Sequence, residues 1–197
     1  MRVAVLTVDQ HGSQTQPDQV PAALGELAAV PVRLAFQRTA GDEFQGVLDD
    51  PAALPAALEH LIRTAVCSIG IGIGEIETPL PDQARAGRGP AYVAAREAVT
   101  AAKSSPWRIR AKGPGDAVRA LESAVWLWAA LLARRTERGW EVADLVDQGL
   151  TYEETASRLG ITQSAVSQRA AAAGIAEGRR ARELVQFLTR TALEGDR

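Results

Sequence analysis

The chain has 197 residues, of which 46% are hydrophobic and 23% charged, and its formal net charge is −2. This composition excludes a disordered protein, and no apolar run approaches the roughly 18–20 residues of a membrane-spanning helix. Cys67 is the single cysteine, which excludes an intrachain disulfide and a cysteine-based zinc site. The short apolar start lacks the cleavage site of a secretory signal, so we expect a cytoplasmic protein with no membrane partner.

The charge is divided unevenly along the chain. Residues 1–102 contain 7 basic and 12 acidic residues, a net charge of −5, whereas residues 103–197 contain 15 basic and 12 acidic residues, a net charge of +3. Such an asymmetry between halves predicts two modules with different partners.

The N-terminal half alternates between strand and helix signals. β-branched and apolar residues in close succession predict four strands, at residues 3–8, 30–38, 43–48 and 66–76. Apolar residues at helical spacing, with proline near each start, predict three helices, at residues 17–29, 51–62 and 90–103. Residues 107–111 are either one more strand or a connector.

The order βαββαβ predicts a ferredoxin-like domain over residues 1–112, so the chain is of the α+β class. Gly113-Pro114-Gly115 nearly coincides with the change in charge and is the predicted domain boundary. Residues 113–197 are predicted to form an all-α domain with helices at residues 116–136, 140–147, 151–159, 163–172 and 176–193.

Within this helical domain, residues 149–169 resemble a DNA-binding helix-turn-helix motif, which we place at about 151–172. Thr151 and Glu154 have the spacing of a capping box, and Thr162 can cap the next helix. Ala156 is small where two such helices cross, and Gly160 allows the positive φ of a tight turn. An alternative is a helical unit that only packs within the protein or onto another protein.

The second helix of this motif would read duplex DNA in the major groove, since its polar side chains suit base edges and phosphates. The predicted contacts are Thr162, Gln163, Ser164, Ser167, Gln168 and Arg169. A net charge of +3 is modest, so we expect a homodimer on the DNA. Either the final helix or the face carrying Trp126 and Trp128 would form the dimer, unless these tryptophans belong to an interdomain core.

Two carboxylates suggest a metal site in the N-terminal domain. Asp9 ends the first strand and Asp42 lies in the central hairpin, and these two strand ends are neighbours in a βαββαβ sheet. Paired carboxylates are ligands that Mg²⁺ uses together with substrate phosphates.

Asp9 and Gly41-Asp42-Glu43-Phe44 resemble the catalytic palm of nucleotidyl cyclases and of the diguanylate cyclases called GGDEF domains. With Ser13, the Ile-Gly-Ile-Gly run at 69–72 and the segment from Gly89 to Arg96, almost the whole chain is similar to the SatD family. The resemblance implies a palm-type domain followed by a helix-turn-helix. It also implies a nucleotide site with Asp42, Ser13 and Arg96, and a metal at Asp9 and Asp42.

Three roles remain open for the palm-type domain: a sensor or oligomerisation domain that binds a nucleotide, a structural fold whose turn carboxylates are solvated, or a metal-dependent nucleotidyl transferase. Acidic residues are common in turns for local hydrogen-bonding reasons. We therefore expect a DNA-binding transcriptional regulator, with an enzyme or a protein-interaction module as the alternatives.

Overall fold

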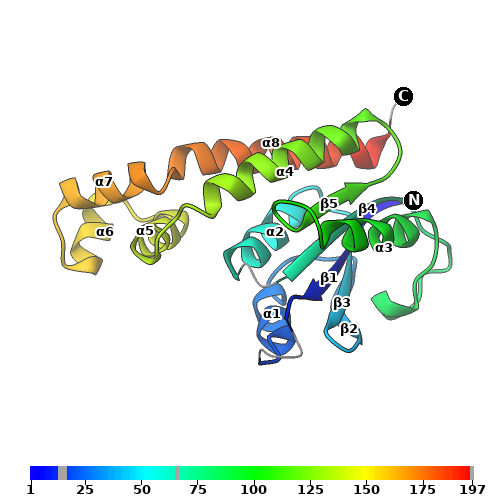
Figure 1. The fold of residues 1–197 in the computed structure, drawn as a ribbon. Helices are drawn as coiled ribbons and strands as arrows, with labels where there is room; N and C mark the ends of the chain where they lie inside the picture. Colours follow the sequence, from blue (N-terminus) through cyan, green and yellow to red (C-terminus); the bar gives the residue numbers. More distant parts are fainter. Residues whose placement is uncertain (13–16, 65–66, 196–197) are drawn as a thin grey trace.

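A five-stranded mixed sheet forms the centre of the N-terminal half (Figure 1), in a computed structural model that describes residues 1–12, 17–64 and 67–195. The α+β class predicted from the sequence is confirmed. Along the sheet the strand order is β2-β3-β1-β4-β5. Each pair of neighbours among the first four strands in this order is antiparallel, and the fifth strand, β5, lies parallel to β4. The strands are β1 (Arg2–Gln10), β2 (Leu34–Ala40), β3 (Glu43–Leu48), β4 (Cys67–Glu75) and β5 (Ile109–Lys112).

Helices fill most of the remaining described chain. Those of the first half are α1 (Val20–Leu27), α2 (Ala53–Thr64), the short 3-10 helix η1 (Ala84–Ala86) and α3 (Pro90–Ala102). Those of the second half are α4 (Asp116–Leu132), α5 (Glu137–Asp147), α6 (Tyr152–Leu159), α7 (Gln163–Ala172) and α8 (Ile175–Glu194). None of the helices within the described residues is long and apolar enough to cross a membrane.

Helix α3 approaches one face of the sheet unusually closely because β4 carries glycine at every second position. A Cβ atom on Gly70 would overlap the backbone of Val99, and one on Gly72 would overlap the backbone of Ala91 and Ala95. The Ile-Gly repeat therefore serves packing: its glycines admit α3, and its isoleucines point to the opposite face, as alternation along a strand requires.

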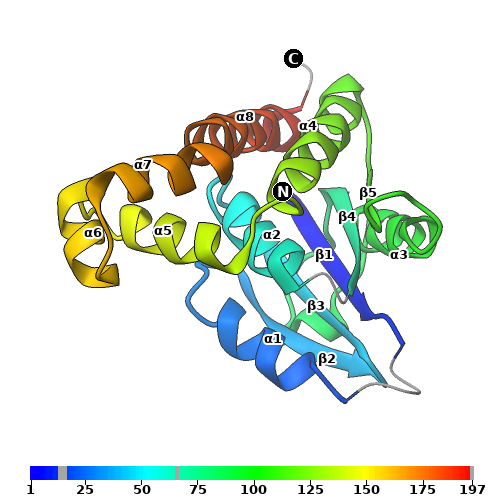
Figure 2. The same ribbon diagram turned by 60° about the vertical axis from the view of Figure 1, so that its left-hand side comes forward.

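The opposite face of the sheet carries a core that extends into the C-terminal half. Leu6 of β1 and Ile71 of β4 belong to the same buried cluster as Leu121 and Trp128 of α4 and Val185 of α8. Trp128 is 1% exposed, so its interpretation as core is confirmed. Helices α4 and α8 run antiparallel, side by side, above the sheet (Figures 1 and 2). One core thus spans the predicted boundary at residues 113–115, and the two-domain division stays a prediction.

Helices α5, α6 and α7 form a separate head at one end of the α4–α8 pair (Figure 1). The head has a core of its own, centred on Val142, Ala156 and Val166. It meets the sheet-bearing part through charged contacts with α2. Arg63 forms a two-pronged ion pair with Asp144, at 2.9 and 3.0 Å, and the guanidinium groups of Arg63 and Arg135 each lie 4.6 Å from the ring centre of Trp140.

A buried carboxylate completes this junction. Glu59 of α2 is ion-paired with Arg182 of α8 and lies 3.6 Å from Arg135, whose side chain is 4% exposed. Removing one partner of a buried ion pair leaves an uncompensated charge, which makes such contacts sensitive to substitution. The orientation of the head therefore depends on α2 as well as on the two helices that lead into it.

Replacing Gly72 with alanine should destabilise the fold by about 1–3 kcal/mol, because the added methyl group overlaps the backbone of α3 and the helix must move. Chemical denaturation of the full chain measures this change. Gly25→Ala in α1 is the matched control, because nothing lies within 4 Å of its Cβ position and alanine favours a helix by up to about 1 kcal/mol. Equal unfolding midpoints for the two variants would contradict the close approach of α3.

Candidate functional site

Helices α6 and α7 are joined by a tight turn at Gly160. This residue has φ 64° and ψ 34°, the left-handed conformation that glycine adopts without steric cost. The amide of Ile161 then donates to the carbonyl of Ala156 at 3.1 Å, which closes the end of α6. The turn sets the angle between the helices and lets Thr162 begin α7.

Side-chain caps define where both helices start. The hydroxyl of Thr151 accepts a hydrogen bond from the amide of Glu154 at 3.2 Å, and the Glu154 carboxylate accepts from the amide of Thr151 at 2.7 Å. The predicted capping box is therefore present. The backbone amide and the hydroxyl of Thr151 both donate to the Glu154 carboxylate, and these two hydrogen bonds hold the pKa of Glu154 below its usual value. The hydroxyl of Thr162 accepts from the amide of Ala165 at 3.2 Å and caps α7.

One side of α7 is buried in the head and the other faces solvent. Val166 is 0% exposed and Ala170 is 3% exposed. Five of the six residues predicted to contact DNA are exposed: Thr162, Gln163, Ser164, Ser167 and Gln168. The sixth, Arg169, is half-buried and lies 3.9 Å from Glu141 of α5, because it stands beside Ala170 at the edge of the buried side.

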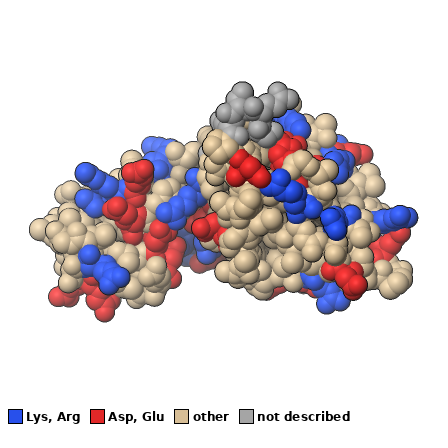
Figure 3. Space-filling view, turned by 90° about the horizontal axis from the view of Figure 1, so that it is seen from below, with Lys and Arg blue, Asp and Glu red and all other residues tan. Residues whose placement is uncertain are grey.

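The other arginines of this region differ in whether they form an ion pair within the chain. Arg179 is paired with Asp147 at 3.2 Å, and Arg180 with Glu183 at 2.7 Å. Arg134, Arg138 and Arg158 are exposed and form no ion pair within the described part of the chain. Figure 3 shows basic and acidic side chains mixed over one face of the head, without a continuous basic area.

A second polar cluster lies at the end of the sheet where Asp9 was predicted to bind a metal. The register pairs Asp9 with Glu43 of β3 and with Ser68 of β4, so these three side chains share one face. Glu43 accepts hydrogen bonds from Arg96 at 2.8 Å and from the hydroxyl of Thr39 at 2.7 Å. The carboxylate that faces Asp9 across the strands is thus that of Glu43.

Two further cations complete this cluster. The ammonium group of Lys103 donates to the carboxylate of Asp9 at 2.9 Å. The guanidinium of Arg108 donates twice to the hydroxyl of Ser68, at 2.8 and 3.2 Å. Asp9, Glu43 and Ser68 are therefore each already bonded to a basic side chain of the same chain.

The other predicted ligands are placed differently. Asp42 is half-exposed in the β2–β3 turn, where its carbonyl accepts from the amide of Gln10 at 3.2 Å. Arg96 is near Asp9 but is bonded to Glu43. Ser13 lies outside the described residues.

Cys67 lies beside this cluster and is 7% exposed. Burial, together with the charges of Asp9 and Asp42, raises the pKa of its thiol to about 11, and Arg108 opposes this rise. A thiol of this kind is an inert core residue, because nucleophilic chemistry needs the thiolate.

The donor chemistry at this end of the sheet suits Mg²⁺, which prefers carboxylate oxygen. Nevertheless, residues 1–12, 17–64 and 67–195 contain no group of three or more histidine, cysteine or acidic side chains placed to hold a metal ion. Asp9 and Asp42 therefore offer two ligands at most, and a bound nucleotide would have to supply others.

Sequence reasoning missed Glu43, Lys103 and Arg108 as parts of this cluster. Glu43 could have been found from strand register, since it is the partner of Asp9. Lys103 and Arg108 follow α3 and precede β5, and no local pattern indicates that β5 returns this segment to the sheet edge.

A hollow of about 1060 Å³ lies between α3, β5 and the start of α4. Its charges are largely compensated within the chain. Arg110 is paired with Glu122, and Lys112 with Glu97, both at 2.9 Å. This balance gives the hollow little net preference for an anionic or a cationic ligand.

Comparisons with protein-family models, with curated proteins and with solved structures found no match to this chain. The helix-turn-helix unit and the polar cluster are therefore the features of the chain that bear on its function.

The capping box should make the stability of the head depend on pH. Since the folded pKa of Glu154 is lowered, its contribution is present above the ordinary glutamate pKa and is lost as the pH falls through the lowered value. Thermal unfolding of wild type and Glu154→Gln should differ at neutral pH and converge in acid. Glu153→Gln, exposed on the same turn, is the control, and a difference between wild type and Glu154→Gln that stays constant with pH would contradict the capping role.

Proposed function

We propose that the chain is a DNA-binding transcriptional regulator that reads duplex DNA with α7. The observation that carries this proposal is that α7 has one buried side and one exposed polar side. Val166 and Ala170 anchor it in the head core, while its first two turns present short polar side chains to solvent at a rigidly capped start. The capped start holds these side chains in fixed positions, as docking of a recognition helix into the major groove requires.

The proposed reading mode follows from the side chains of α7. Gln163 and Gln168 each carry an amide that can bind adenine in a bidentate way, and Ser164 and Ser167 can bond to several base edges. Arg134, Arg138 and Arg158 are free to meet phosphates, which supply affinity and make it dependent on salt. Arg169 would bind a phosphate only after its ion pair with Glu141 is broken.

The head, α5 to α7, contains three arginines and six acidic residues, a net charge of −3, and this favours a two-fold complex. One copy offers few cations, so binding two half-sites at once would raise the affinity without a strongly basic surface. A regulator of this kind acts on chromosomal DNA and would work in the cytoplasm as a homodimer.

We further propose that residues 1–112 form a palm-type, ferredoxin-like domain and that the chain is of the SatD type. The order β2-β3-β1-β4, with antiparallel neighbours throughout, supports this fold. The presence of α1 and α2 on the same side of the sheet also supports it.

Nucleotide sensing at the polar cluster is the second candidate function. Lys103, Arg96 and Arg108 converge on one end of the sheet, and phosphate oxygens could replace the acceptors that they now bind, which are Asp9, Glu43 and Ser68. Asp9 and Asp42 would hold Mg²⁺, which when bound would neutralise phosphate charge. Nucleotidyl transfer is favoured less, because Asp9 and Glu43 are both engaged by cations.

Replacing both Gln163 and Gln168 with alanine should lower the affinity for an enriched sequence by about 30-fold or more and relax its sequence preference, since each bidentate contact discriminates by roughly 1–3 kcal/mol. The target is first selected from a random duplex pool with the wild-type protein, and affinities are then measured by fluorescence anisotropy. Gln83→Ala, at the residue that precedes η1 and far from the head (Figure 1), is the control. Unchanged sequence preference in the double variant would contradict the proposal.

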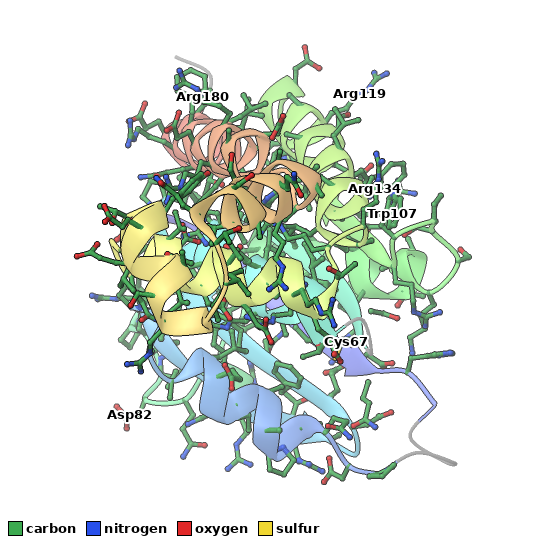
Figure 4. All side chains as sticks on the ribbon, turned by 90° about the vertical axis from the view of Figure 1, so that its left-hand side faces the viewer. Cys67, Asp82, Trp107, Arg119, Arg134 and Arg180 are labelled. Atoms are coloured by element: carbon green, nitrogen blue, oxygen red, sulfur yellow. The ribbon has the colours of Figure 1, made fainter. Side chains whose placement is uncertain are left out.

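If the polar cluster senses a nucleotide, a panel of nucleoside di- and triphosphates with Mg²⁺ should contain members that raise the unfolding temperature. Lys103→Met should abolish this shift, because it removes a cation from the proposed phosphate site. Asp82→Asn, exposed at a distant edge of the sheet (Figure 4), should leave it intact. Shifts that survive Lys103→Met would place the ligand elsewhere, and the absence of any shift would remove this second function.

A further inference from the structure

The outer face of the α4–α8 pair exposes large apolar side chains to solvent. Leu127 of α4 is 74% exposed, and Leu184 and Phe187 of α8 are 47% and 58% exposed. Only six large hydrophobic residues are exposed in the whole described structure, and half of them lie on these two helices. Apolar groups gathered on one face indicate an interaction surface.

These residues lie along the seam between the two helices. Leu131, on the same side of α4 and one turn from Leu127, packs against Gly174 and Gly178 at the start of α8. Because the helices are antiparallel, Leu127 is level with the turn of α8 that precedes Leu184. The three exposed side chains therefore belong to one surface, directed away from the sheet.

Charged residues on α8 flank this surface in a pattern that is complementary to itself. Arg180, Glu183, Phe187, Arg190 and Glu194 recur at spacings of three and four residues, so they form one exposed stripe. Figure 4 shows Arg180 at the outer side of α8, and Arg119 at the outer side of α4, both directed away from the body of the protein. Arg190 and Glu194 form no ion pair within the described chain.

We propose that this face binds a second copy of the chain, with the two α8 helices antiparallel about a two-fold axis near Phe187. In that arrangement Phe187 meets Phe187 of the partner subunit. Arg180 lies opposite Glu194 of the partner subunit, and Glu183 lies beside Arg190 of the partner subunit. A two-fold interface requires such self-complementarity, because the same surface is used twice.

A second copy fits this face for two reasons beyond charge. Helix α8 has 20 residues and is about 30 Å long at 1.5 Å per residue, so two α4–α8 pairs can form a four-helix bundle. The face is also on the side of the molecule opposite α3, so pairing leaves the polar cluster around Asp9 and Arg96 uncovered. The inference rests on the proposed DNA reading only in that two copies would bind two half-sites.

Sedimentation equilibrium without DNA tests the pairing. The wild-type protein should be a dimer, and Leu184→Glu combined with Phe187→Glu should weaken the dimer at least 100-fold while the chain stays folded by far-UV circular dichroism, because both side chains are exposed. Val93→Glu on α3, 60% exposed, is the matched control and should leave the dimer intact. A monomeric wild-type protein, or a dimer that is unchanged in the double variant, would overturn the proposal.

Charge reversal tests the orientation of the two helices. Arg180→Glu should weaken the dimer by about 3- to 10-fold, and adding Glu194→Arg should restore it, because the intermolecular pair is rebuilt with reversed signs. The same double variant does not rebuild the internal pair of Arg180 with Glu183, so rescue cannot come from within one chain. Failure of rescue would overturn the antiparallel pairing about Phe187.

These measurements separate the two proposals. If the dimer is lost in the apolar variants but single-copy binding to DNA still depends on Gln163 and Gln168, both proposals stand. If the wild type dimerises as described but binds no duplex DNA at low salt, the proposed function fails and the pairing stands.

Discussion

The structure depends on one shared apolar contact, the packing of the α4–α8 pair onto the sheet. Trp128 and Leu121 of α4 and Val185 of α8 are almost completely buried in the same core as Leu6 and Ile71. Since burial of apolar area is the dominant favourable term in folding, the sheet and these helices stabilise each other. The head and the outer face of the pair are then held in fixed positions with respect to the sheet.

The head contacts the sheet-bearing part through ion pairs and through cation–π contacts, and the chain also connects the two directly. Helix α2 supplies Glu59 and Arg63 to this junction, and its apolar side packs on the sheet. A rearrangement at the sheet that moved α2 would act on Trp140 and Asp144, and through them on α5. This contiguous path is the physical basis on which ligand binding at the sheet could alter DNA reading at α7, provided that α2 has a second stable position.

Local signals predicted the elements that are defined locally. The capped starts of α6 and α7, the proline start of α3 and the bounds of β3 agree with the structure, because caps, proline and strand alternation act within a few residues. The predicted start of β2 at Val30 was wrong, since Pro31 has no amide to donate and Val30 is buried instead; the strand begins at Leu34. The polar cluster could be predicted only in part. The pairing of Asp9 with Glu43 and the return of Lys103 and Arg108 to the sheet are set by register and by β5, which contacts far apart in sequence determine.

Hydrogen exchange of the full chain, with and without a duplex selected from a random pool, tests the central claim most directly. The account predicts slower exchange of amides in α7 and in the turn at Gly160 when DNA is bound, because these groups would be enclosed in the major groove. It predicts unchanged exchange in the sheet strands, which are already protected by their ladders. Protection confined to other helices, or no protection at a DNA concentration that saturates the protein, would contradict it.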